Sequence, residues 1–325
     1  MTKKARLQAA IKGEAVDRIP IAFWRHFPGD DQRADDLAKA IIAFQRRFDF
    51  DFVKVTPSSS FTVEDWGVKA VYRGNQEGTR EYTERRVKSP EDWHRLEPLD
   101  VTKGALGRQL NCLRLLKQEF KDEVPFIQTI FNPLAVARYL RGDRFLVDMR
   151  THPDALHAGL EVITDTLARF IKEVTNTGAA GIFLAVQHAT YRLLSEGEYR
   201  EFGIKYDLAA LNAATGSWFN VLHIHGDDIM FDLLNDYPVQ AVNWHDRSTS
   251  PSLAEAKGRF AGALIGGIKQ WETLLTGDPE DVEGEVRDAI AQTEGRGLII
   301  GAGCVIPVTA PEGNIWAAKR AAVRK

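Results

Sequence analysis

Cysteine and methionine are scarce in this sequence, which has two cysteines and three methionines among 325 residues. Two cysteines exclude the disulfide framework of a small secreted protein, so each thiol needs its own explanation. Cys112 lies in a segment of helical pattern and is expected to be an inert core thiol. Cys304 lies in a glycine-flanked loop after a short apolar run, so it is a candidate metal ligand.

Long apolar runs and an excess of one charge are also missing. No stretch approaches the 18 or more apolar residues that a membrane span needs, and the N-terminus lacks the apolar region of a secretory signal. The formal net charge is -3 and no block of lysine and arginine occurs. The sequence therefore predicts a cytoplasmic protein that binds neither membrane nor nucleic acid but a small-molecule substrate. A homodimer is compatible with this composition.

Short apolar runs separated by longer segments of helical period recur along the whole chain. Such alternation is typical of βα units. Eight runs are expected to be strands: Ile19–Trp24, Asp51–Val55, Pro125–Ile130, Gly181–Val186, Phe219–Ile224, Val239–Asn243, Ala261–Gly266 and Leu298–Gly301. The count predicts an α/β fold, a (β/α)8 TIM barrel.

The second and third runs are separated by a long segment, residues 56–124, which is read as an insertion between strands 2 and 3. It is expected to hold a hairpin at Val68–Thr83 and a helix near Leu106–Phe120. No linker rich in proline, glycine or serine divides the chain, so residues 1–325 are predicted to form one domain.

Residues with metal-binding and proton-transfer chemistry gather at the C-terminal ends of the predicted strands, where barrels of this kind carry their active sites. Five of the eight histidines lie there: His26, His188, His223, His225 and His245. Arg25, Gln187, Asn243 and Cys304 share this location. A purely structural explanation does not account easily for this clustering.

His223 and His225 are two residues apart on one strand, so their side chains point to the same face. Cys304 follows the last strand, where flanking glycines let the backbone turn and expose the sulfur. Two imidazoles and a thiolate suit zinc, whose catalytic sites keep three protein ligands and an open position. The alternative is that these are ordinary buried histidines and a small apolar thiol.

The remaining candidates each have a functional and a plain interpretation. Arg25 and His26 are expected either to bind a carboxylate or phosphate by charge-assisted hydrogen bonds or to form a surface ion pair. His245 is a fourth ligand or an acid/base group, or part of a loop network. Tyr139 and Gln187 are expected either to contact the substrate or to be buried. Further candidates for substrate binding are Trp24, Asn243 and Trp244.

Several short motifs, taken in order, resemble the uroporphyrinogen decarboxylase superfamily nearly end to end. These are Asp17-Arg18-Ile19-Pro20 with Arg25, then Asp51, Asn132-Pro133 leading to Tyr139, Gly266-Gly267-Ile268, and Gly303-Cys304 with Pro307 and Asn314. The superfamily includes tetrapyrrole decarboxylases and zinc-dependent methyltransferases that move methyl groups between corrinoids and thiols. The resemblance implies a (β/α)8 barrel with its site at the strand C-termini.

The resemblance favours the methyltransferase branch. The decarboxylases resemble P-x-W-x-M-R-Q-A-G-R at the first strand, whereas this chain has His26 for the glutamine and Gly29 for the second arginine. The methyltransferases use an H-x-C pair and a later cysteine as zinc ligands. His223, His225 and Cys304 occupy these positions, with histidine for the middle cysteine.

Three functions follow from these readings. In the first, zinc on His223, His225 and Cys304 binds an acceptor thiol, and the methyl group comes from a methylcorrinoid on a partner protein or from a small methylated substrate. In the second, a metal-free decarboxylase uses Arg25 to fix a carboxylate, and Asp51, Tyr139 or a histidine stabilises charge on the reacting ring. The third is a non-catalytic barrel that binds a small molecule.

Overall fold

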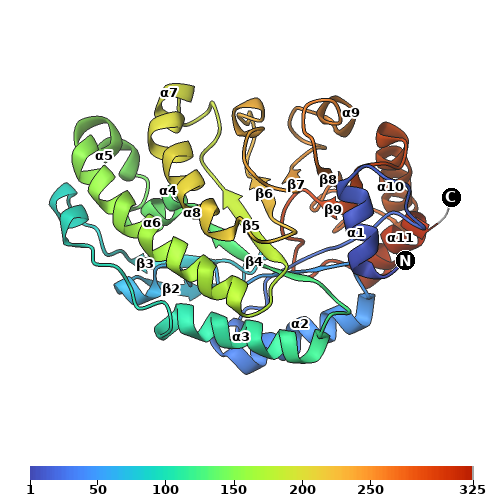
Figure 1. The fold of residues 1–325 in the computed structure, drawn as a ribbon, viewed down its shortest axis with the longest axis horizontal. Helices are drawn as coiled ribbons and strands as arrows, with labels where there is room; N and C mark the ends of the chain where they lie inside the picture. The colour runs from blue at the N-terminus through green and yellow to red at the C-terminus, as the bar shows by residue number, and fades with distance from the viewer. Residues whose placement is uncertain (324–325) are drawn as a thin grey trace.

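A curled sheet of parallel strands forms the centre of the molecule (Figure 1). The computed structural model describes residues 1–323. Neighbouring strands pair in parallel in the order β1 (Val53–Val55), β4 (Phe126–Phe131), β5 (Gly181–Val186), β6 (Val221–Ile224), β7 (Ala241–Trp244), β8 (Ala263–Ile268) and β9 (Leu298–Ala302). The bounds of each strand differ by at most two residues from those of a predicted strand. The fold is therefore the expected α/β class with seven of the eight expected strands.

The first predicted strand, Ile19–Trp24, is reduced to a single parallel bridge between Ile21 and Ile300 of β9. Pro20 has no N–H to donate, and the N–H of Ile21 donates to the Asp51 carboxylate at 2.8 Å instead of to a strand carbonyl. The N–H of Asp51 in turn donates to the carbonyl of Ile21 at 3.0 Å. A side chain thus replaces part of the ladder between this segment and β1.

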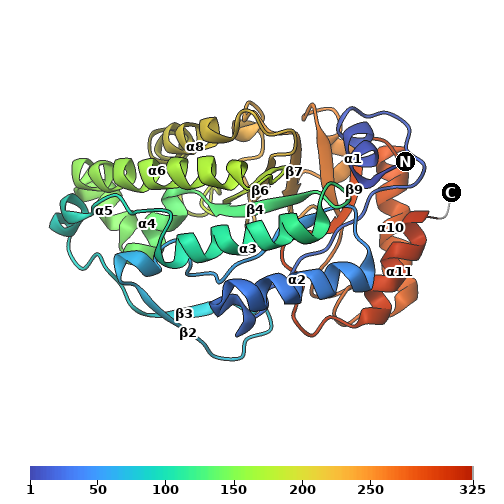
Figure 2. The ribbon, with the colours of Figure 1, turned by 60° about the horizontal axis from the view of Figure 1, so that its bottom comes forward.

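An antiparallel hairpin and a long helix lie between β1 and β4 in the sequence, close to their predicted positions. The hairpin pairs β2 (Lys69–Tyr72) with β3 (Arg80–Glu84), and the helix is α3 (Gly104–Phe120). Figure 2 shows the hairpin next to α2 (Ala34–Phe48), away from the main sheet.

The other helices pack around the sheet, as Figure 1 shows. Helix α2 contacts α3, and α10 (Pro279–Thr293) contacts α11 (Glu312–Val323) beside the two chain ends. None of the helices within residues 1–323 is both long and apolar enough to cross a membrane. The remaining α-helices are α1 (Lys3–Ile11), α4 (Pro133–Arg141), α5 (Phe145–Thr151), α6 (Pro153–Asn176), α7 (Glu196–Tyr199), α8 (Lys205–Leu211) and α9 (Leu253–Ala256).

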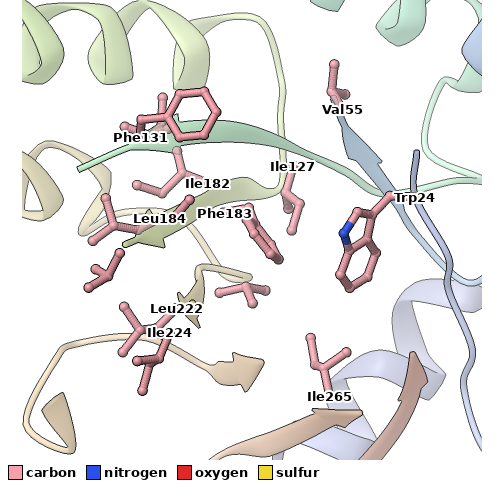
Figure 3. Packing of buried hydrophobic residues seen from close by; sticks show 14 of the residues in the cluster. Trp24, Val55, Ile127, Phe131, Ile182, Phe183, Leu184, Leu222, Ile224 and Ile265 are labelled. Atoms are coloured by element: carbon pink, nitrogen blue, oxygen red, sulfur yellow. The ribbon is translucent and has the colours of Figure 1, made fainter. Parts of the chain in front are cut away.

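Side chains alternate between the inner and outer faces of the curled sheet, as Figure 3 shows for β5. Phe183 points inward to Trp24, with ring centroids 5.4 Å apart in an edge-on arrangement. Ile182 and Leu184 are fully buried on the other face. Both faces of these strands are therefore mostly apolar.

Candidate metal centre and its cavity

A cavity of about 150 Å³ lies inside the C-terminal end of the sheet. It is lined by the segment after Ile21, by β1, β4, β5 and β6, and by the loop that follows β9. Seven of the predicted site residues line it: Trp24, His26, Tyr139, Gln187, His223, His225 and Cys304.

Three of these residues bring potential metal ligands together. His223 lies on β6, His225 follows directly after it, and Cys304 lies two residues after β9. One ligand atom from each lies within 4.8 Å of the other two. The Cys304 Sγ is 3.8 Å from the His225 Nδ1. The ends of two strands that do not adjoin in the sheet thus meet at one point.

The protonation of His223 is fixed by Asn243 on the neighbouring strand β7. The Asn243 Nδ2 donates to the carbonyls of Ile265 and Ala302, at 2.9 and 3.1 Å. Its Oδ1 therefore faces the His223 Nδ1, 2.7 Å away, and accepts a hydrogen bond from the N–H at that nitrogen. This leaves a lone pair on the His223 Nε2, a buried atom with no hydrogen-bond partner among the described residues.

The electrostatics of the centre favour a thiolate. Burial alone would raise the pKa of Cys304, but the neighbouring imidazoles of His223, His225 and His245 hold that pKa well below its usual range. Burial lowers the pKa of His223. It acts in the same direction on His225, where the hydrogen bond and charge of Cys304 outweigh it and raise the pKa of that imidazole.

The donor set fits a zinc ion. A metal ligand must offer a lone pair, and the His223 Nε2 is a buried lone pair without a partner. Asn243 supplies the hydrogen bond that orients a ligating imidazole through its other nitrogen. The remaining histidine near the centre is His245, whose ring centroid lies 5.1 Å from that of His225 and whose Nδ1 is also buried without a partner in residues 1–323.

His26, Tyr139 and Gln187 line other parts of the cavity wall. The His26 Nδ1 donates to the carbonyl of Pro57 at 3.0 Å, and burial lowers the pKa of this imidazole to about 3, so it is neutral. The Tyr139 hydroxyl donates to the Gln187 Oε1 at 2.6 Å. Burial raises the pKa of Tyr139, which therefore stays protonated. These three groups offer hydrogen bonds without charge.

Lys54 on β1 is a cavity residue that the sequence reasoning missed. It is 7% exposed, and in the part of the chain that the structure describes its ammonium has no carboxylate partner. The Nζ lies 4.7 Å from the ring centroid of Phe183 and 3.4 Å from the hydroxyl of Thr56. Burial lowers the pKa of Lys54 to about 8. The presence of a lysine in the middle of an apolar strand was the one sequence feature that could have indicated this cavity residue.

Glu77 is the second cavity residue that was missed. It lies in the loop between β2 and β3, far in sequence from every strand of the main sheet. No pattern in the sequence connects this loop with the C-terminal ends of the strands, so only the folded chain reveals the contact.

Arg25 and Asp51 do not lie at the cavity, contrary to expectation. The Arg25 guanidinium donates to the carbonyl of Val308 and sits against the rings of Phe27 and Phe44, outside the cavity. Asp51 precedes β1 and so lies at the opposite end of the strand, where it is fully buried. Its carboxylate is held by Arg6 and Arg18 and by a backbone N–H, so its role is structural.

His188, Asn243 and Trp244 also lie outside the cavity lining. His188 is fully buried against Phe145, with ring centroids 5.0 Å apart, and burial lowers its pKa to about 3. Both polar groups of Asn243 are used within the protein, as described above. The Trp244 Nε1 donates to the carbonyl of Pro251, and its ring packs on Phe231. These residues cannot contact a molecule in the cavity without rearrangement.

Comparison with known sequences identifies the family. The uroporphyrinogen decarboxylase (URO-D) family matches residues 2–324. The methylcobamide:CoM methyltransferase MtbA of Methanosarcina mazei is 25% identical to this chain, over 97% of this chain and 95% of that protein. A uroporphyrinogen decarboxylase of Aeromonas salmonicida is 27% identical, over 50% of this chain and 46% of that protein. The family predicted from the motifs is thereby confirmed.

A solved structure agrees with these matches. A methyltransferase from Methanosarcina mazei superimposes with a TM-score of 0.86 at 21% identity, and the match covers 99% of this chain and 98% of that one. At this level of identity the likeness establishes the fold, which the two proteins share along their whole length.

Proposed function

Because this chain belongs to the uroporphyrinogen decarboxylase (URO-D) family, we propose that it is a zinc-dependent methyltransferase. It would move a methyl group from a corrinoid, or from a small methylated substrate, to a thiol acceptor. His223, His225 and Cys304 are the proposed metal ligands. The observation that carries this proposal is the convergence of these three ligand atoms within 4.8 Å, with the His223 Nε2 lone pair free.

The placement of the other candidates argues against the decarboxylase alternative. That reaction was expected to use Arg25 to fix a carboxylate, and Asp51, Tyr139 or a histidine to stabilise charge. Tyr139 and three histidines line the cavity, but Arg25, the only group expected to fix the carboxylate, does not, and neither does Asp51. The relatives that match along nearly the whole chain are also methyltransferases by name. The decarboxylase relative from Aeromonas salmonicida matches half of it.

The size of the cavity indicates which of the two reactants this chain would bind. A cavity of about 150 Å³ holds a molecule of roughly the size of benzene. It therefore suits a small thiol, whereas a corrin macrocycle is far larger. We propose that a corrinoid, when it is the donor, stays on a partner protein and approaches the open end of the sheet.

The residues of this chain would bind and orient the acceptor. Zinc on the three ligands would act as a Lewis acid that lowers the pKa of a thiol in the open fourth position. Phe183 and Trp24 form the apolar wall, which excludes water from the sulfur. Tyr139 and Gln187 offer neutral hydrogen bonds, and the Lys54 ammonium favours a negative charge inside the cavity.

We also propose the finer description of the fold. The bridge between Ile21 and Ile300 and the hydrogen bond from Asp51 to Ile21 link the two edges of the sheet through the first segment. This supports a closed (β/α)8 barrel in which residues 1–325 form one domain and residues 56–124 are an insertion.

Metal analysis tests the proposal most directly. Wild-type protein purified without chelator or affinity-tag metal should contain about one zinc ion per chain. His225→Ala and Cys304→Ser should each lower this content, whereas Cys112→Ala, which removes the buried thiol distant from the site, should not. Methylcobalamin and a small thiol then serve as donor and acceptor. A metal-free wild type, or carbon dioxide release that persists in Cys304→Ser, would overturn the proposal.

A further inference from the structure

The loop between β2 and β3, residues 73–79, brings a carboxylate to the wall of the cavity. Glu77 lines the cavity together with His225 and Cys304. Across residues 1–323 the structure gives the Glu77 side chain no hydrogen bond and no ion pair. A half-buried carboxylate without a partner is unusual, because burial of a charge is costly unless another group compensates it.

The backbone around Glu77 is held firmly against the metal centre. The Asn75 Oδ1 accepts from the N–H of Thr79 at 3.1 Å, and the Asn75 Nδ2 donates to the carbonyl of Thr79 at 2.7 Å, so the loop is closed on itself. The carbonyl of Gln76 accepts from the N–H of Val308 at 2.8 Å, which ties the loop to the segment that carries Cys304. The backbone on either side of Glu77 is therefore fixed by the fold.

Gly78 shows how closely this loop approaches the cavity. A Cβ atom at Gly78 would lie 2.6 Å from the Cβ of His26 and 3.1 Å from Val308, and the φ of Gly78 is 79°, in the left-handed region. A side chain at this position would push the loop away from the centre. The glycine thus permits the contact that places Glu77 at the wall.

The charged and titratable groups facing Glu77 leave it as the available base. Burial raises the pKa of Glu77 and the negative Cys304 raises it further, while His225 and His245 lower it. His26, on the segment packed against the loop, has a pKa of about 3 and is a poor proton acceptor at neutral pH. Lys54 is a cation at neutral pH, and Tyr139 stays protonated.

We propose that Glu77 is the proton acceptor for the acceptor thiol, an inference that rests on the proposed function. When the thiol enters the cavity, its S–H bond breaks and the electron pair stays on sulfur. An O–H bond forms on the Glu77 carboxylate, which keeps this proton until the methyl group has been transferred and only then releases it to water through the open end. The thiolate then attacks the methyl group of the donor, whose bond to carbon breaks with its electron pair remaining on the donor.

Calorimetry of thiol binding tests this step without any methyl donor. Zinc-loaded protein is titrated with 2-mercaptoethanol at pH 7 in two buffers of different ionisation enthalpy, which gives the number of protons released. Wild type should release about one proton fewer than Glu77→Gln, because Glu77 retains the proton. Glu81→Gln, an exposed carboxylate on the same hairpin, is the matched control and should behave as wild type. Equal release by all three proteins would overturn the inference.

The acidity of the thiol provides a second readout. With 2-mercaptoethanol and methylcobalamin, Glu77→Gln should lower kcat/KM about 100-fold, the usual effect of losing a general base. With trifluoroethanethiol, which ionises far more readily, the loss should be below about 10-fold, and Glu77→Asp should recover part of both rates. An equal loss with both thiols would show a merely structural role. If wild type transfers no methyl group to either thiol, the proposed function itself fails.

Discussion

Lys54→Met is expected to make the folded protein more stable, although it removes a residue from the cavity wall. Lys54 is 7% exposed and its ammonium has no carboxylate partner anywhere in residues 1–323. Methionine has a similar length and no charge, and its thioether packs well against aromatic rings. Phe183 and Trp24 provide such rings, with centroids 4.7 and 6.0 Å from the Lys54 Nζ.

The expected gain follows from the pKa. Burial lowers the pKa of Lys54 from 10.5 to about 8, and each pKa unit corresponds to about 1.4 kcal/mol, so the charged form costs about 3 kcal/mol in the folded state. At pH 7, Lys54→Met should therefore raise the free energy of unfolding by about 3 kcal/mol.

The pH dependence has a definite sign. Between pH 8 and 10.5 the unfolded chain binds more protons at this lysine than the folded chain does. The stability of wild type should therefore rise with pH across this window, relative to Lys54→Met, and the difference between the two proteins should vanish by about pH 11.

Urea denaturation at pH 7 and pH 10 measures both effects. Lys39→Met is the matched control, because the Lys39 side chain is 73% exposed on α2, and its stability should match wild type within about 0.5 kcal/mol. A Lys54→Met protein that is less stable than wild type at pH 7, or a difference that does not change with pH, would refute the reasoning from burial.

Three further changes test the proposed metal centre and one buried hydrogen-bond network elsewhere in the fold. Asn243→Leu removes the acceptor that fixes the tautomer of His223, so metal affinity, measured by competition with a chelating dye, should fall about 10- to 100-fold; unchanged affinity would contradict the tautomer assignment. Gly303→Ala would place a Cβ 2.9 Å from the Cα of His245, so we expect a lower thermal midpoint and less bound metal, whereas wild-type values for both would show that the strand end yields. In the wild type, two tyrosine hydroxyls and one asparagine amide donate hydrogen bonds to the buried Asp207 carboxylate. Asp207→Asn replaces part of this acceptor with an N–H donor, so the free energy of unfolding measured in urea should fall by about 1–3 kcal/mol. A smaller loss would mean that the network is dispensable.

Most strands could be located from the sequence because a parallel strand is buried on both faces. Such strands appear as continuous apolar runs, and β5 was predicted at its observed bounds, Gly181–Val186. The segment Ile19–Trp24 has the same composition but forms one bridge, because the side chain of Asp51 takes the place of a backbone acceptor. Composition does not reveal such a substitution, since it depends on a residue thirty positions away.

Position at the end of a strand predicted which residues lie near the cavity, but not which of them face it. The alternation of side chains along an extended segment decides which residues face the cavity, because neighbouring side chains point to opposite faces. Trp24 and His26 line the cavity while Arg25 between them points away. Gln187 lines it and His188 does not. The same rule places His223 and His225 together, which is why the pair was recognisable from the sequence.

Lys54 and Glu77 were missed for different physical reasons. Lys54 lies on β1 with its side chain facing the cavity. Because a lysine is rarely buried without a carboxylate partner, its position in the strand did not suggest that it lines the cavity. Glu77 reaches the cavity through the hairpin, by contacts of the loop with His26 and Val308. Contacts of this kind arise only when distant parts of the chain fold together.

Histidine at position 225, where the zinc methyltransferase pattern has cysteine, changes the charge of the proposed centre. Two neutral imidazoles and one thiolate leave a divalent metal with one excess positive charge, whereas a second thiolate would cancel it. An acceptor thiolate then brings the centre to neutrality, which favours its binding but makes its sulfur less electron-rich. Lys54 adds a positive charge on one side of the cavity, and Glu77 adds a negative one on another. Such a centre would gain most from a nearby base that removes the thiol proton, and Glu77, which lines the cavity together with His225 and Cys304, is the residue we propose for this role.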